Sequence, residues 1–201
     1  MTAEAPRRVG LFGGTFDPPH IGHVRVVADV ADHLDLDTVL WIPARVPPHK
    51  EPGGQSPAEV RLEMVREAVR ADPRFQVCTL ELERAGPSYT VDTARALHER
   101  EPEAELYLIM GVDQYKELST WHRPEELLAL VRLAVMDRDG ESARAASAGV
   151  SGAEDAVFVP VRRVDVSSTA VRAAVRDGRD PSPWLPDGVA AIIRREGLYF
   201  A

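Results

Sequence analysis

The stretch Val9-Gly-Leu-Phe-Gly-Gly-Thr-Phe-Asp-Pro-Pro-His-Ile-Gly-His23 joins an apolar segment to a glycine pair and two histidines. Val9 to Phe12 has the composition of a buried strand, and the glycine pair follows it directly. Beyond it, apolar residues recur at helical spacing, namely Val24, Val27, Ala28, Ala31 and Leu34. The stretch is therefore expected to form the turn between a first strand and a first helix.

Strand-like and helix-like segments alternate along the rest of the chain. Further strands are expected at residues 38–42, 75–80, 106–110, 133–136 and 157–159. Further helices are expected to begin near residues 56, 90, 124, 167 and 187. This alternation with short connections predicts an α/β fold, a doubly wound and mostly parallel sheet with helices on both faces. Residues 1–201 are expected to form one domain, with a C-terminal helical part, about 167–201, packed on it.

Local sequence signals predict several helix boundaries. Ser56-Pro-Ala-Glu59 has the pattern of a capping box with proline at the first helical position. Thr90 is expected to cap the helix after the 83–89 loop, and Ser167 or Ser168 the helix that stops at Gly178. Residues 139–156 show no periodicity and are expected to form a surface loop.

Composition narrows the class of protein. The chain has 201 residues, 44% of them hydrophobic and 28% charged, which excludes wholesale disorder, and no apolar run approaches the roughly 18 residues of a membrane span. The formal net charge of -8 argues against a nucleic-acid polymer as partner and leaves small anionic ligands open. A lone cysteine, Cys78, and the lack of an apolar N-terminal stretch favour a cytoplasmic protein. A homo-oligomer stays open.

The turn after the first strand has the features of a phosphate site. Gly13 and Gly14 let backbone N–H groups approach an anion, and the following helix directs its positive end at the same place. His20 and His23, three residues apart, can project from one side of the first helical turn. The alternatives are a structural turn with surface histidines and a metal site. A turn needs no histidine pair and zinc would need a third ligand, so phosphate binding is favoured. The run matches neither the G-x-G-x-x-G fingerprint nor a P-loop.

A second anion site is expected at Ser167-Ser-Thr-Ala-Val-Arg172. Hydroxyls and exposed amides at a helix N-terminus can bind phosphate, and the Arg172 guanidinium lies about one turn further along. Taken alone, the segment is better explained as an ordinary capped helix with a solvated arginine. Together with the first motif it favours a polyphosphate site.

The two motifs in this order resemble the nucleotidyltransferase superfamily named for its Thr/His-x-Gly-His signature, and within it the bacterial nicotinate-nucleotide adenylyltransferases. Further matching segments are Pro47-Pro-His-Lys50, Gly86-Pro-Ser-Tyr-Thr-Val-Asp-Thr93, Gly111-Val-Asp113, Trp121 and Leu198-Tyr-Phe200. The likeness runs from residue 9 to residue 200. Pro19 departs from it, since the family usually has an aliphatic residue there, but this does not remove a phosphate ligand.

The resemblance implies a Rossmann-like fold and transfer of AMP from ATP to nicotinate mononucleotide, with release of pyrophosphate, in NAD biosynthesis. The attacking phosphate has a second pKa of about 6, so no protein nucleophile is required. The implied catalytic residues are His20, His23 and Arg172. The implied ATP-binding residues are Gly13, Gly14, Thr15, Phe16, His20, His23, Gly111, Asp113, Ser168, Thr169 and Arg172. Mg²⁺ is expected to be carried by ATP, with no metal ligand from the protein.

Three residues are expected to bind the mononucleotide. Trp121 could stack on the pyridine ring, although simple packing explains it about equally well. The Thr90 hydroxyl and nearby amides could accept the carboxylate, and Lys50 could contact the phosphate or be an ordinary solvated lysine. Open alternatives are adenylyl transfer to nicotinamide mononucleotide or phosphopantetheine, cytidylyl transfer to an alcohol phosphate, and a non-catalytic nucleotide sensor of the same fold.

Overall fold

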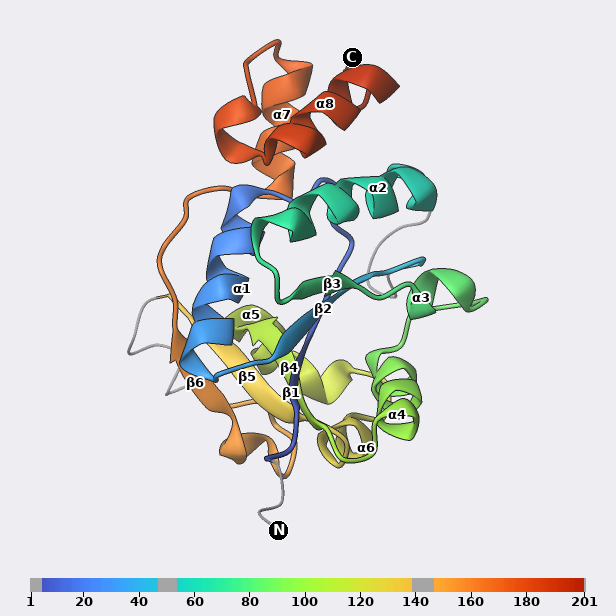
Figure 1. Ribbon diagram of the computed structural model, residues 1–201, viewed down its shortest axis with the longest axis vertical. Helices are drawn as coiled ribbons and strands as arrows, with labels where there is room; N and C mark the ends of the chain where they lie inside the picture. The colour runs from blue at the N-terminus through green and yellow to red at the C-terminus, as the bar shows by residue number, and fades with distance from the viewer. Residues whose placement is uncertain (1–4, 47–53, 139–146, 201) are drawn as a thin grey trace.

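The computed structural model describes residues 5–46, 54–138 and 147–200 (Figure 1). Six strands form one sheet in the order β3-β2-β1-β4-β5-β6, and every neighbouring pair is parallel. The strands are β1 (Arg8–Gly14), β2 (Thr38–Pro43), β3 (Phe75–Val77), β4 (Glu105–Gly111), β5 (Arg132–Asp137) and β6 (Val157–Pro160). The predicted parallel α/β fold is confirmed.

Strand β1 lies at the point where the strand order reverses. It pairs with β2 on one side and with β4 on the other, so that Val9 lies opposite both Thr38 and Leu106. In doubly wound sheets ligands bind outside the carboxyl ends of the strands at this reversal point. The glycine pair that ends β1 is therefore at the position where the fold places a ligand.

Helices cover both faces of the sheet. One face carries α1 (Ile21–His33) and α2 (Ala58–Ala68), while α7 (Ser168–Arg176) and α8 (Asp187–Glu196) lie beyond these helices and extend the same apolar core. The other carries α3 (Leu80–Glu83), α4 (Thr90–Arg100), α5 (Val112–Lys116) and α6 (Pro124–Leu128). Alternate residues of β4 enter the two cores, since Tyr107 and Ile109 belong to the first and Leu108 and Met110 to the second. Short 3₁₀ turns lie at Val69–Ala71, Leu118–Thr120, Ala153–Asp155 and Ser182–Trp184.

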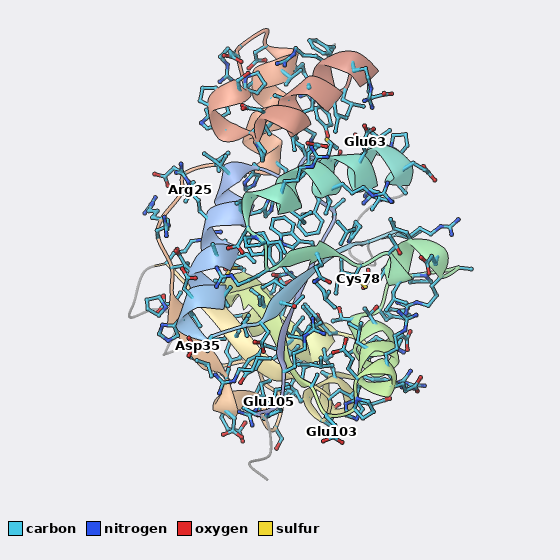
Figure 2. All side chains as sticks on the ribbon, viewed as in Figure 1. Arg25, Asp35, Glu63, Cys78, Glu103 and Glu105 are labelled. Atoms are coloured by element: carbon cyan, nitrogen blue, oxygen red, sulfur yellow. The ribbon has the colours of Figure 1, made fainter. Side chains whose placement is uncertain are left out.

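The C-terminal helices pack on α2 (Figure 1). A Cβ atom added to Gly188 would lie 2.3 Å from Glu67 Oε2, so the Glu67 side chain of α2 lies directly against the backbone of α8 at this glycine and would have to move to admit a larger residue. Glu63, on the side of α2 that faces these helices (Figure 2), accepts from the Arg195 guanidinium at 2.6 Å. This packing supports our proposal of a single domain. No helix of the described residues is long and apolar enough to cross a bilayer.

Three predicted boundaries are wrong. The segment 75–80 is a strand only over Phe75–Val77, because the chain turns into the short helix α3 at Leu80. Pro57, rather than Ser56, is the N-cap of α2, and there is no capping box because Ser56 Oγ donates to the Tyr199 hydroxyl at 3.3 Å instead. Tyr89, rather than Thr90, precedes α4, so Thr90 is its first helical residue.

The predicted ends of α7 and α8 are confirmed. Ser167 caps α7, with its Oγ accepting from the N–H of Ala170 at 3.1 Å. Gly178 follows α7 with φ of 70°, and Gly197 ends α8 with φ of 61°. The left-handed backbone at both positions explains why glycine stands there.

Candidate active site

The turn after β1 is built from tightly constrained residues. Phe16 has a left-handed backbone with φ of 51°, and the peptide bond between Asp17 and Pro18 is cis. The Phe16 ring is buried, with its centroid 5.3 Å from that of Trp41, so Phe16 can serve a ligand only through its backbone. A Cβ atom added to Gly13 would meet nothing within 4 Å, so the space in front of this glycine is open.

His20 and His23 cap α1 reciprocally. His20 Nδ1 accepts from the backbone N–H of His23 at 3.3 Å, and His23 Nδ1 accepts from the backbone N–H of His20 at 3.2 Å. The two rings stack, with centroids 3.7 Å apart. Because both Nδ1 atoms are acceptors, each neutral ring carries its proton on Nε2. The pair therefore offers two N–H donors at the N-terminus of a helix.

Burial keeps both imidazoles neutral. It lowers the pKa of His20 from 6.5 to about 4, and the positive charge of Arg138 acts in the same direction. Burial also lowers the pKa of His23 well below 6.5, helped by the charges of His20 and Arg138. Arg138 was missed in the sequence, where its position just after the strand 133–136 was the available signal.

The N-terminus of α7 meets the turn after β1. Ser168 Oγ donates to the carbonyl of Pro18 at 2.8 Å, and Arg172 Nη1 donates to the carbonyl of Asp17 at 2.7 Å. Arg172 Nη2 also donates to Thr169 Oγ1 at 3.3 Å. The two motifs, which are far apart in the sequence, thus lie together in the structure. Two helix N-termini and a guanidinium surround the same loop, a strongly anion-attracting arrangement.

Gly13 and Gly14 also line a cavity of about 600 Å³. It is lined by Leu11, Gly13, Gly14, Thr15, Ile42, Ala44, Glu81, Ser88, Tyr89, Thr90, Thr93, Leu108, Ile109, Met110, Gln114, Glu117, Thr120, Trp121, His122 and Arg123. Thr90 and Trp121 were predicted to bind one substrate together, and they share this cavity. Most of the residues predicted to bind ATP do not line this cavity, namely Phe16, His20, His23, Gly111, Asp113, Ser168, Thr169 and Arg172. The site therefore has two parts that meet at the glycine pair.

A buried carboxylate, Glu81, was missed in the sequence. It is 6% exposed, accepts from Thr93 Oγ1 at 3.0 Å and lines the cavity. Arg84 Nη2 donates to the same Thr93 hydroxyl and to the carbonyl of Tyr89. Burial raises the pKa of Glu81. This network fixes the loop that leads into α4 and so fixes the cavity wall.

Aromatic and basic side chains that line the cavity, Tyr89, His122 and Arg123, were also missed. The rings of Tyr89 and His122 stack with centroids 4.2 Å apart. Arg123, which follows, has a left-handed backbone with φ of 52°. Tyr89 lies inside the segment 86–93, which matches the nucleotidyltransferase family, so its position, though not its role, could be predicted from the sequence.

The remaining predicted residues are placed as follows. Gly111 ends β4 and is the N-cap of α5, and Asp113 lies exposed in the first turn of that helix. Cys78, beside β3 and α3 (Figure 2), is buried, and burial raises the pKa of its thiol, so it is a poor nucleophile. Lys50 lies outside the described residues. Within residues 5–46, 54–138 and 147–200, no three His, Cys, Asp or Glu side chains are grouped to hold a metal ion.

The lowered histidine pKa values predict a pH dependence of stability. Below pH 6.5 the unfolded chain binds protons at these histidines while the folded protein does not, down to about pH 4 at His20. The free energy of unfolding should therefore fall as the pH falls through this window. The contribution of His20 alone between pH 6.5 and about pH 5 is about 2 kcal/mol. Urea unfolding of wild type and His20→Ser at about pH 7 and pH 5 measures it.

Serine is chosen because it keeps a helix cap while removing the titrating ring. His33→Ser removes an exposed histidine from the last turn of the same helix and is the matched control. The His20 variant should lose less stability on acidification than wild type, and the His33 variant should follow wild type. Equal losses in all three proteins would contradict the neutral state of His20.

Comparison with known proteins adds sequence relatives. A family model described as cytidylyltransferase-like matches residues 11–174. A protein of Thermus thermophilus named "Probable nicotinate-nucleotide adenylyltransferase" is 43% identical over 192 residues, covering 96% of this chain and 99% of its own. A protein of Geobacillus thermodenitrificans with the same name is 40% identical over 194 residues, covering 96% of this chain and 87% of its own.

A solved structure shares the fold. The Plasmodium falciparum nicotinic acid mononucleotide adenylyltransferase complexed with NaAD superimposes with a TM-score of 0.77 over 96% of this chain and 97% of its own. Its sequence is only 16% identical, so this likeness concerns the arrangement of strands and helices. The architecture that places the two-part site is thus one that known proteins share.

Proposed function

Because the chain belongs to the cytidylyltransferase-like family, we propose that it is an adenylyltransferase that transfers AMP from ATP to nicotinate mononucleotide. The products are nicotinate adenine dinucleotide and pyrophosphate, which places the reaction in NAD biosynthesis. The observation that carries the proposal is the meeting of the histidine pair with Arg172 around one loop, next to a separate cavity. The names of the relatives supply the choice of acceptor.

The chemistry needs positioning more than proton transfer. A phosphate oxygen of the mononucleotide attacks the α-phosphorus of ATP, and the bond from that phosphorus to the β-phosphate oxygen breaks. The attacking phosphate is already mostly ionised near neutrality, so it needs no general base. In the proposal His20 and His23 donate from Nε2 to the phosphates, and Ser168, Thr169 and Arg172 hold the leaving pyrophosphate. Such fixed donors stabilise the charge that develops in the transition state.

The second substrate is assigned to the cavity. No side chain caps α4, so the N–H groups of Thr90 and Val91 and the Thr90 hydroxyl are proposed to bind a carboxylate, whereas the Asp92 N–H already donates to the Tyr89 carbonyl. Backbone N–H groups only donate, which favours the acid over an amide acceptor. Trp121 is half-buried in the cavity wall and supplies a flat apolar surface for a pyridine ring. Lys50 toward the mononucleotide phosphate and Asp113 toward the adenosine ribose complete the proposed set.

The metal in the proposal is Mg²⁺ bound to ATP. It would neutralise part of the triphosphate charge, and the protein would hold it through the phosphates. The buried carboxylate within the turn after β1, Asp17, already accepts from the Tyr199 hydroxyl and the Ser56 N–H, so its oxygens suit internal support better than metal binding. A cytoplasmic location belongs to the same proposal, supported by the single free cysteine, Cys78.

An acceptor panel tests the function. Purified protein is incubated with ATP, Mg²⁺ and, in separate reactions, nicotinate mononucleotide, nicotinamide mononucleotide, phosphopantetheine or an alcohol phosphate, and pyrophosphate release is measured. A parallel set with CTP tests cytidylyl transfer. The highest kcat/KM is expected with nicotinate mononucleotide and ATP. Faster turnover with the amide would overturn the acid assignment, and no release with any acceptor would favour a nucleotide sensor.

Trp121→Ala should raise the KM for the mononucleotide about fivefold or more, since loss of one aromatic stacking partner costs on the order of 1 kcal/mol or more. The KM for ATP should change less than about twofold, because Trp121 lies in the cavity and not beside the histidine pair. Steady-state kinetics with each substrate varied in turn measures both values. Trp121→Phe keeps a flat ring and is the matched control. An effect confined to ATP would refute the stacking role.

A further inference from the structure

Asp17 is buried and accepts hydrogen bonds from three other parts of the chain, at Ser56, Arg172 and Tyr199. Its carboxylate is 4% exposed, and Oδ1 accepts from the Tyr199 hydroxyl at 2.6 Å while Oδ2 accepts from the N–H of Ser56 at 3.2 Å. Its backbone carbonyl accepts from Arg172 Nη1 at 2.7 Å. Asp17 belongs to the turn after β1, so the end of the chain reaches that turn directly.

The contact to Tyr199 is held in a demanding geometry. Tyr199 has a left-handed backbone with φ of 68°, which a bulky side chain adopts only where surrounding contacts fix it. Phe16, the residue before Asp17, is also left-handed. The Tyr199 hydroxyl accepts a hydrogen bond from Ser56 Oγ at 3.3 Å and donates one to Asp17 Oδ1 at 2.6 Å. The hydroxyl therefore acts both as donor and as acceptor, in addition to the packing of the ring.

We propose that Tyr199 is a positioning residue, which fixes the Asp17 carboxylate and thereby keeps the turn before His20 aligned with Arg172. Two bonds from the C-terminal part end on one residue: Arg172 holds the carbonyl of Asp17 and Tyr199 holds its carboxylate. The direction in which the histidine pair presents its donors depends on the path of this turn. The expected effect on ATP binding rests on the proposed function. The structural link from Tyr199 through Asp17 to the turn does not.

The coupling is tested by hydrogen exchange of Tyr199→Phe, which keeps the ring and removes only the hydroxyl. Exchange of the amides of residues 15–17 and 20–23 should accelerate about tenfold, the scale for one lost hydrogen bond to a charged group. Amides of the central strand β4 should exchange as in wild type. Phe200→Leu changes the neighbouring, 57% exposed aromatic residue and should leave the turn unchanged. Unchanged exchange at the turn, or equal acceleration everywhere, would overturn the proposal.

The effect of Tyr199 on function is measured by comparing the KM for ATP with the KM for nicotinate mononucleotide. In Tyr199→Phe the KM for ATP should rise about fivefold to tenfold while the KM for nicotinate mononucleotide stays within about twofold. A merely structural defect would lower the amount of active enzyme and leave both KM values unchanged, and that result would refute the positioning role. If the wild-type protein released no pyrophosphate, the proposed function would fail, and hydrogen exchange would still decide the coupling.

Discussion

Replacing His20 with alanine is expected to lower kcat about 10²–10³-fold, the scale for removing one donor that stabilises a transition state. The structure gives the reason, because the Nδ1 atom of His20 is used in the helix cap and Nε2–H is left as its donor. Burial keeps the ring neutral near pH 7, so it remains a donor of fixed geometry throughout the working range. The measurement is pyrophosphate release at saturating ATP and mononucleotide.

The alanine variant also loses the cap of α1, a cost of about 1 kcal/mol in stability that circular dichroism can follow. His20→Ser separates the two effects because serine restores a cap without reaching the phosphates. It should regain the stability and keep the loss in kcat. His33→Ala, at the exposed end of the same helix, should keep wild-type turnover. A His20 variant within about twofold of wild type would contradict the role proposed for this imidazole.

The fold could be predicted because its signals are local. The apolar run of β4 and the spacing of valines and alanines in α1 each report the burial of one element, whatever the rest of the chain does. The boundaries failed where a distant residue intervened. Ser56 has the sequence pattern of a helix cap, yet its hydroxyl bonds to Tyr199, which lies 143 positions away. A local sequence pattern cannot show that Tyr199 competes with the helix N-terminus for the Ser56 hydroxyl.

The same distinction applies to the candidate site. The two phosphate motifs could be recognised because helix N-termini, glycines and a histidine pair are local features. The roles of Glu81 and Arg138 could not be predicted, because Glu81 matters through the cavity wall and Arg138 through the place that the tertiary fold gives its charge, even though the position of Arg138 just after a strand could be noticed. Trp121 and Thr90 were singled out through a resemblance, and the structure gives them a common cavity. Their roles remain predictions that the kinetic experiments test.

The buried Arg61 shows how the two halves of the site are held in register. Arg61 is 1% exposed and reaches three backbone carbonyls: Nε donates to Ser56 at 3.1 Å, Nη1 to Thr15 at 2.8 Å and Nη2 to Arg45 at 3.4 Å. These carbonyls belong to the loops after β1 and β2 and to the approach to α2. Its position could have been noticed, because Arg61, Met64, Val65 and Ala68 follow helical core spacing.

Arg61→Met should therefore lower the free energy of unfolding by about 3–5 kcal/mol, the usual cost of removing one partner from a buried charged network. Three backbone carbonyls would lose their hydrogen-bond donor. The buried Asp17 carboxylate would also lose its electrostatic attraction to the Arg61 guanidinium. Urea unfolding measures the change, with the slope m expected to stay constant because the folded surface is the same.

Two further variants decide whether the fork geometry matters. Arg61→Lys keeps the charge but cannot reach three carbonyls at once, so it should recover only part of the lost stability. Arg66→Met removes an exposed arginine from the same helix and should change the free energy of unfolding by less than about 0.5 kcal/mol. If Arg61→Met cost no more than Arg66→Met, the loops would be held by other contacts. A lysine variant as stable as wild type would instead assign the effect to charge alone, independent of the three-way hydrogen bonding.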